Sequence, residues 1–208
     1  MAAYGRPTLR DLFDGASTPH IAHPPRTHHR GFYLATDGSY HGDGGGLGVV
    51  VETQDGTRVT RLSRSDHSPD NNIAEYRALH LGLDVLVTRI PAGARVGVLV
   101  DHDDLAANVN ATILAQRDPN REPVAPVSVP SGVGHHWRGI EARLAELGTV
   151  RAAVVDGTEN PAHPLANAPE LYAHVNEQPA RCVLPESLGP DPAEEIPPPS
   201  RANRHAGD

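Results

Sequence analysis

Residues 72–87 read NIAEYRALHLGLDVLV, and their apolar side chains recur at the spacing of a helix. The apolar face comprises Ala74, Ala78, Leu79, Leu81, Leu83, Val85 and Leu86. Pro91 follows shortly after, and proline does not continue a helix. The pattern therefore predicts one long helix that buries a broad face.

Three strands are predicted before this helix. Residues 31–36 (GFYLAT) and 47–53 (LGVVVET) are apolar runs separated by a glycine-rich turn. Asp55 and Gly56 then form a strong turn signal, and residues 57–63 complete a hairpin. We expect these three strands to be antiparallel, with the first strand ending at Asp37.

Two further strands are predicted after the helix, at residues 95–100 (RVGVLV) and 150–155 (VRAAVV). Strands that are joined through helices tend to be parallel. Three helical pieces are expected around them, at residues 104–114, 134–147 and 161–174. The sequence thus predicts an α/β fold, with a five-stranded mixed sheet of three antiparallel and then two parallel strands, flanked by helices.

The two ends of the chain differ from its centre. Residues 1–29 mix prolines and histidines without a sustained period, which predicts a disordered or extended N-terminal tail. Residues 175–208 are rich in proline and are predicted to be a second tail, a linker or a docking strip for a protein partner. One domain is expected between them, at residues 30–174.

Composition excludes several classes of protein. The net charge of the 208-residue chain is −8 and all 18 basic residues are arginine, so a broad basic surface is not expected. A partner that carries phosphates would then need local arginines or metal ions. The chain has a single cysteine, Cys182, no long apolar run and no signal-like N-terminus, so we expect a cytoplasmic protein that uses neither disulfides nor a membrane.

Three acidic residues are expected at one edge of the predicted sheet. Asp37 and Asp101 each follow a strand, and Glu75 lies in the first turn of the long helix. Each has a structural explanation when taken alone: Asp37 as a turn residue, Glu75 in a capping box headed by Asn72, and Asp101 as a strand end. Together they predict a cluster of carboxylates, which repel one another unless Mg²⁺ or Mn²⁺ neutralises them.

Three segments resemble the acidic motifs of the prokaryotic type 1 ribonuclease H family, in the same order and at similar spacing. They are residues 33–48 (YLATDGSYHGDGGGLG), 71–83 (NNIAEYRALHLGL) and 98–105 (VLVDHDDL). The resemblance covers about residues 31–174. It implies a ribonuclease H-like fold and an endonuclease that hydrolyses the RNA strand of RNA·DNA hybrids, leaving 5′-phosphate and 3′-hydroxyl ends.

The same resemblance implies roles for individual residues. Asp37, Glu75 and Asp101 would be catalytic ligands of two Mg²⁺ or Mn²⁺ ions. Four residues would lie along the groove that binds the hybrid: Gly38, Ser39, Asn71 and Asn72.

The family's fourth acid has no counterpart here, because residues 160–166 read NPAHPLA and place His163 at that position. Imidazole also binds metal ions or moves protons, so His163 is predicted to be the fourth catalytic and metal-binding residue. The alternative is a surface residue in a site that has decayed. Asp156 and Glu159 are nearby acids and are alternative substitutes for the missing one, although Asp156 is favoured as a turn residue.

Other departures favour a second hypothesis, a catalytically impaired ribonuclease H-like module that binds nucleic acid or acts as a scaffold. Asp103 stands where the family often has an amide, and no lysine-rich segment is present. A different nuclease on the same fold is a third interpretation. Trp137 is in helical register with apolar neighbours and is predicted to be core, while His135 and His136 lead into a helix and receive no role.

Overall fold

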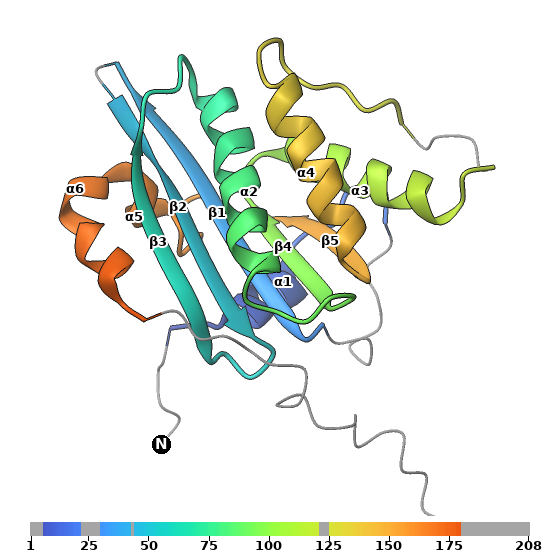
Figure 1. Ribbon diagram of the computed structural model, residues 1–208, viewed down its shortest axis with the longest axis horizontal. Coiled ribbons are helices and arrows are strands. Elements are labelled where there is room, and N and C mark those ends of the chain that lie inside the picture. The colour runs from blue at the N-terminus through green and yellow to red at the C-terminus, as the bar shows by residue number, and fades with distance from the viewer. Residues whose placement is uncertain (1–5, 22–29, 43, 121–124, 180–208) are drawn as a thin grey trace, which may run out of the picture.

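The computed structural model describes residues 6–21, 30–42, 44–120 and 125–179. Its five strands form one sheet in the order β3-β2-β1-β4-β5 (Figure 1). The strands are β1 (Phe32–His41), β2 (Gly44–Thr53), β3 (Arg58–Asp66), β4 (Arg95–Val100) and β5 (Thr149–Val154). The β1–β2 and β2–β3 pairs are antiparallel, and the β1–β4 and β4–β5 pairs are parallel. The predicted mixed sheet is confirmed.

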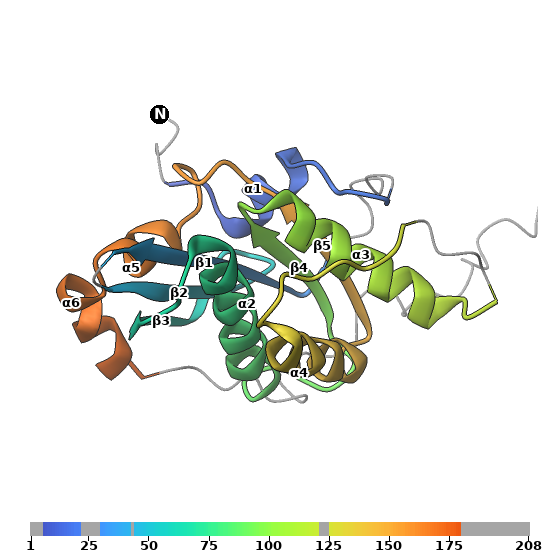
Figure 2. The ribbon, with the colours of Figure 1, turned by 90° about the horizontal axis from the view of Figure 1, so that it is seen from above.

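Helices cover both faces of this sheet. They are α1 (Leu9–Gly15), α2 (Asn71–Val87), α3 (Asp103–Arg117), α4 (Gly134–Glu146), α5 (His163–Asn167), α6 (Pro169–Tyr172) and the 3₁₀-helix η1 (Ala173–Glu177). Figure 2 shows α2 and α4 on one side of the sheet and α1 on the other. Within the part of the chain that the structure describes, no helix combines the length and apolar character needed to span a membrane.

The alternation of side chains along the central strands builds two cores. In β1, Phe32 and Leu34 join the core under α2, α3 and α4, whereas Tyr33 and Ala35 join the core under α1 and α5. Successive side chains of a strand point to opposite faces, so an uninterrupted apolar run is what a strand covered on both faces requires.

Strand β1 is longer than predicted, because it continues through Asp37 to His41 instead of ending before Asp37. Its antiparallel pairing with β2 runs along its whole length, whereas its parallel pairing with β4 stops at Ala35. Asp37 thus lies within a strand, and just beyond the point where β4 no longer pairs with it.

The prediction of a tail over residues 1–29 is wrong for the segment that forms α1. Thr8 and Asp11 form a capping box at its start. Leu9 and Phe13 are buried, and the Phe13 ring packs edge-on against Tyr33 with ring centroids 5.6 Å apart. Residues 1–5 and 22–29 lie outside the described residues.

The packed domain also extends beyond the predicted boundary at residue 174. Val175 is fully buried, and the Asn176 side chain accepts a hydrogen bond from Ser63 N (2.9 Å) and donates one to Ser63 O (2.6 Å). The 3₁₀-helix η1 is therefore hydrogen-bonded to β3. Residues 180–208, which include Cys182 and most of the proline-rich tail, lie outside the described residues.

Candidate active site

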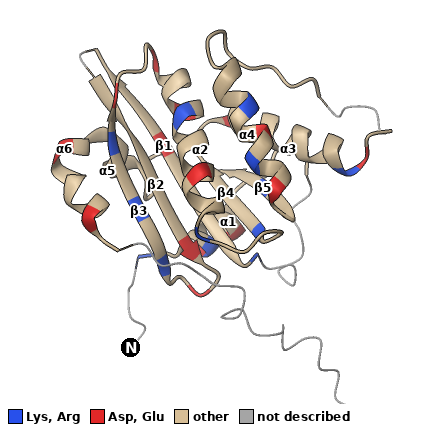
Figure 3. Cartoon of the chain, in the orientation of Figure 1, with Lys and Arg blue, Asp and Glu red and all other residues tan. Residues whose placement is uncertain are grey.

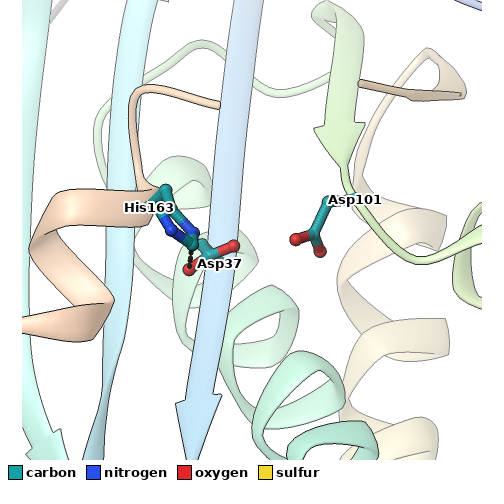
Figure 4. Close-up of side chains that lie close together, drawn as sticks. All are labelled: Asp37, Asp101 and His163. Carbon is teal, nitrogen blue, oxygen red and sulfur yellow. Dashed lines mark ion pairs between the residues drawn. The ribbon is translucent and has the colours of Figure 1, made fainter. Parts of the chain in front are cut away.

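Three side chains from separate elements converge at one edge of the parallel strands. Asp37 lies in β1, Asp101 directly follows β4, and His163 is the first residue of α5 (Figure 4). One ligand atom from each lies within 4.8 Å of the others. The carboxyl ends of parallel strands meet at the same sheet edge, which explains why Asp37 and Asp101 come together.

Asp37 is almost completely buried, with 1% of its surface exposed. Its Oδ2 atom lies 3.3 Å from His163 Nδ1, and its Oδ1 atom has no hydrogen-bond partner among the described residues. Burial, together with the negative charge of Asp101, raises the pKa of Asp37 to about 8. A bound cation would stabilise a carboxylate that is buried in this position.

Glu75 faces the same cluster from α2. Its two carboxylate oxygens are buried without a hydrogen-bond partner in the described part of the chain. Burial, then the charges of Asp101 and Asp37, raise the pKa of Glu75 to about 10. Buried oxygen donors that lack partners and repel one another are the donor set that a hard divalent cation such as Mg²⁺ or Mn²⁺ fits.

The capping-box explanation for Glu75 is wrong. Helix α2 is capped by Asp70, whose carboxylate accepts a hydrogen bond from Ile73 N at 2.8 Å, and not by Asn72. Glu75 lies further along the helix, where its side chain points into the protein instead of back to the cap.

His163 is held between two partners. Its Nε2 atom lies 2.7 Å from Asn167 Nδ2, one helical turn away, and its Nδ1 atom faces Asp37. The side chain is 43% exposed, so one side of the ring remains open to solvent. The resemblance predicted both residues as ligands of one site, and the structure shows their direct contact across 126 positions of the chain.

Asn160 anchors the segment that carries His163, and sequence reasoning gave it no role. The buried side chain donates a hydrogen bond to Thr36 O (2.9 Å) and accepts one from Ala162 N (3.0 Å). It thereby ties the loop to β1 beside Asp37. The signal in the sequence was its spacing, because only two residues separate Asn160 from His163.

The two acids proposed as substitutes for the missing fourth acid differ from His163 in their placement. Asp156 is exposed and accepts hydrogen bonds from Thr158 N (2.8 Å) and Thr158 Oγ1 (2.6 Å), as a turn residue does. Glu159 is also exposed. Neither belongs to the group of ligand atoms around Asp37 among the described residues.

Two of the four predicted groove residues are enclosed by the protein. A Cβ atom at Gly38 would lie 2.2 Å from Ala74 C, so this glycine lets β1 approach the α2 backbone. Ser39 is buried, and its hydroxyl donates to Ala166 O (2.6 Å) and accepts from Gly46 N (3.1 Å). Gly38 and Ser39 therefore contribute to the site by packing inside the protein, and their side-chain positions are not exposed to a ligand.

Asn71 and Asn72 are exposed at the start of α2, where a ligand can reach them. His102 orients Asn72, a role that the sequence did not reveal. His102 Nδ1 accepts from Leu105 N (3.2 Å), so Nε2 carries the proton and donates to Asn72 Oδ1 (3.1 Å). The Asn72 amide nitrogen is then left as the outward donor.

Asp103 has a structural explanation. It is exposed in the first turn of α3, where a carboxylate interacts favourably with the helix dipole. Trp137 is 6% exposed within the core, as predicted. Arginines lie on several elements, and three of them, Arg58, Arg61 and Arg64, follow one another along β3 (Figure 3).

Comparisons with known proteins agree with this architecture. No family model matches the sequence, and no curated protein sequence matches it. The fold is similar to that of LC11-RNase H1, isolated from compost by a metagenomic approach, with 19% identity over 72% of this chain and 98% of that one and a TM-score of 0.51. LC11-RNase H1 in complex with an RNA/DNA hybrid matches at 21% identity over 65% and 93%, with a TM-score of 0.51. RNase H1 of the archaeon Halobacterium salinarum matches at 18% identity over 66% and 95%, with a TM-score of 0.47.

These similarities establish a ribonuclease H-like fold. The group of Asp37, Asp101 and His163 lies at the end of its parallel strands, where open α/β sheets bind their ligands, and Glu75 lies outside this group of ligand atoms but interacts with Asp101 and Asp37 from α2.

Proposed function

We propose that this protein is a metal-dependent endonuclease that hydrolyses the RNA strand of RNA·DNA hybrids to 5′-phosphate and 3′-hydroxyl ends. The observation that carries the proposal is the burial of Asp37 and Glu75 beside Asp101, with three carboxylate oxygens (Asp37 Oδ1, Glu75 Oε1 and Glu75 Oε2) that have no hydrogen-bond partner among the described residues. The similarity in fold to a ribonuclease H1 that forms a complex with an RNA/DNA hybrid supports the choice of substrate.

Asp37, Glu75 and Asp101 would hold two divalent cations, with Mg²⁺ or Mn²⁺ favoured by the oxygen donors and His163 as an additional ligand. Such cations supply an activated water and charge stabilisation on the departing 3′ oxygen during in-line attack at phosphorus.

The chain's own residues position the substrate. The Asn72 amide, oriented by His102, offers a donor at the start of α2 that fits a ribose 2′-hydroxyl, the group that distinguishes RNA from DNA. Asn71 lies exposed beside it. His163 Nδ1 faces Asp37 at 3.3 Å, where it can exchange a proton with that carboxylate.

One observation favours the second candidate function, a catalytically impaired module that binds nucleic acid. His163 Nε2 lies 2.7 Å from the Asn167 amide, an arrangement in which Nδ1 carries a proton toward Asp37 instead of offering a lone pair to a metal ion. An aspartate at this position would add a negative charge where the imidazole adds none.

The test is cleavage of an end-labelled RNA·DNA hybrid, beside matched RNA and DNA duplexes, with Mg²⁺ or Mn²⁺ at low and high salt. We expect hybrid-selective cutting, and we expect its rate to fall by about 10³-fold in Asp101→Asn because this variant loses a carboxylate ligand of the metal ions. Each factor of ten corresponds to about 1.4 kcal/mol of lost transition-state stabilisation. Asp156→Asn is the matched control, since Asp156 is an exposed turn aspartate outside the cluster. Equal rates in the two variants would contradict the proposal.

His163→Asp separates the two candidate functions. A large gain in the Mg²⁺-dependent rate would identify the native site as impaired, whereas an unchanged or lower rate would identify His163 as a working ligand. Binding of the hybrid without cleavage by either metal, from folded protein, would favour the binding module. The cytoplasmic location and the protein partner of the proline-rich tail remain predictions.

A further inference from the structure

A second group of chemically active side chains lies away from the carboxylate cluster. Residues of β2, β3, α2 and α4 line an open surface pocket of about 500 Å³. Four histidines line it: His67, His80, His135 and His136. None of the residues of the candidate active site lines this pocket, so it is a separate feature of the surface.

Two of these histidines already approach each other as the ligands of one metal ion do. His80 Nδ1 and His136 Nδ1 lie 3.1 Å apart, and the ring centroids are 5.3 Å apart. Two nitrogens bound at about 2.0–2.1 Å to one ion, at angles between 90° and the tetrahedral value, are separated by about 2.9–3.4 Å. The observed separation falls within this interval.

The surroundings of His80 orient its Nδ1 atom toward His136. Asp84 Oδ2 lies 3.7 Å from His80 Nε2, and Asp84 is itself held by Arg143 Nε at 2.6 Å. At 3.7 Å this carboxylate is within ion-pair distance of the ring but is not hydrogen-bonded to it; a carboxylate near the far nitrogen is a common support of a metal-binding imidazole. Helix α4 has Gly139 where a Cβ atom would meet His80 Nε2 at 2.1 Å, so the ring fits only because this residue is glycine.

The remaining donors of the pocket are also imidazoles. The His135 ring is tilted by 45° against that of His136, with ring centroids 3.8 Å apart, and His67 lines the pocket as an exposed residue directly after β3. The nearby Asp66 carboxylate is already engaged by Arg77 at 3.0 Å and by Ser68, which leaves nitrogen as the available donor type.

We propose that this pocket binds one divalent transition-metal ion of the Zn²⁺, Ni²⁺ or Co²⁺ class through His80 and His136, with water completing the coordination. Imidazole donors favour these metals, whereas the carboxylate cluster around Asp37 favours Mg²⁺ or Mn²⁺. The bound ion would join α2 to the first turn of α4.

The experiment titrates Zn²⁺ alone into the full chain in metal-free buffer and follows heat and melting temperature. His80→Gln and His136→Gln each remove one ligand. We expect each variant to lose one high-affinity equivalent of bound Zn²⁺, with the affinity for Zn²⁺ weakened by at least about tenfold. Each variant should also lose the rise in melting temperature that Zn²⁺ gives the parent protein.

Two controls assign the binding to this pocket. His174→Gln changes an exposed histidine of η1 and should bind Zn²⁺ like the parent. Asp101→Asn measures how much Zn²⁺ the carboxylate cluster binds. The equivalent of Zn²⁺ that His80→Gln loses should still bind to Asp101→Asn. If His80→Gln does not fold, His136→Gln, at the partly exposed start of α4, gives the same test. Parent-like stoichiometry and affinity in the folded variants would overturn the proposal.

Discussion

Replacement of Gly38 by alanine should separate the two elements that bring Asp37 and Glu75 together. The added Cβ atom would lie 2.2 Å from Ala74 C and 2.4 Å from both Ala74 O and Glu75 N. These are backbone atoms of α2, which cannot rotate away as a side chain can. Strand β1 and α2 must therefore move apart by roughly 1 Å to restore an ordinary contact distance.

The displacement has a cost in stability and a cost in activity. Overpacking of this kind destabilises by about 1–3 kcal/mol, which for a domain of this size lowers the melting temperature by about 5 °C. We expect misplacement of Asp37 and Glu75 by about 1 Å to reduce the proposed cleavage of the hybrid by about 100-fold. The activity loss should exceed the loss of folded protein, because most molecules remain folded at the assay temperature.

The assays are thermal unfolding and cleavage of the RNA·DNA hybrid, with Gly31→Ala as the matched control. A Cβ atom at Gly31 meets no atom within 4 Å, so this variant should retain the stability and rate of the parent. If Gly38→Ala also retained both, the close approach of β1 to α2 would not be what places Asp37 beside Glu75.

Three further predictions follow from other parts of the structure. Phe13→Ala should lower the free energy of unfolding by about 3–5 kcal/mol in urea, since α1 packs this fully buried ring against the sheet; a loss below about 1 kcal/mol would make α1 dispensable. Asn160→Ala should lower it by about 1–3 kcal/mol and reduce cleavage, because Thr36 O and Ala162 N lose their partner; parent-like rates would remove Asn160 from the positioning of His163. Because the pKa of Glu75 rises from 4.5 to about 10 on folding, the metal-free native state keeps a proton that the unfolded chain releases, so stability should fall as pH rises through this interval. In Glu75→Gln, urea midpoints measured in EDTA from pH 5 to 9 should show a shallower fall than in the parent, and equal slopes would contradict the assignment.

Much of the architecture was predictable because it depends on local periodicity. The apolar run before Asp37 identified a strand buried on both faces, and residues 72–87 identified the long helix; the structure contains both. Asp37 and Asp101 were predicted to meet because parallel strands end at a common edge, a rule that needs only the order of the elements. The overturned predictions include α1, the end of β1, the cap of α2 and the boundary at residue 174. Helix α1 was missed because seven residues with two buried side chains are too short to show a period.

The sequence by itself determined the order of strands and helices and the convergence of three carboxylates, because hydrophobic spacing and turn residues act between neighbours in the chain. Only the tertiary structure decided how the site is completed. Pairing with β2 extends β1 past Asp37, His102 orients Asn72, and His163 reaches Asp37 across 126 positions. The physical reason is that hydrogen bonds and close packing between distant segments depend on side-chain direction and on distances of a few ångströms, and neither leaves a repeating signal in the sequence.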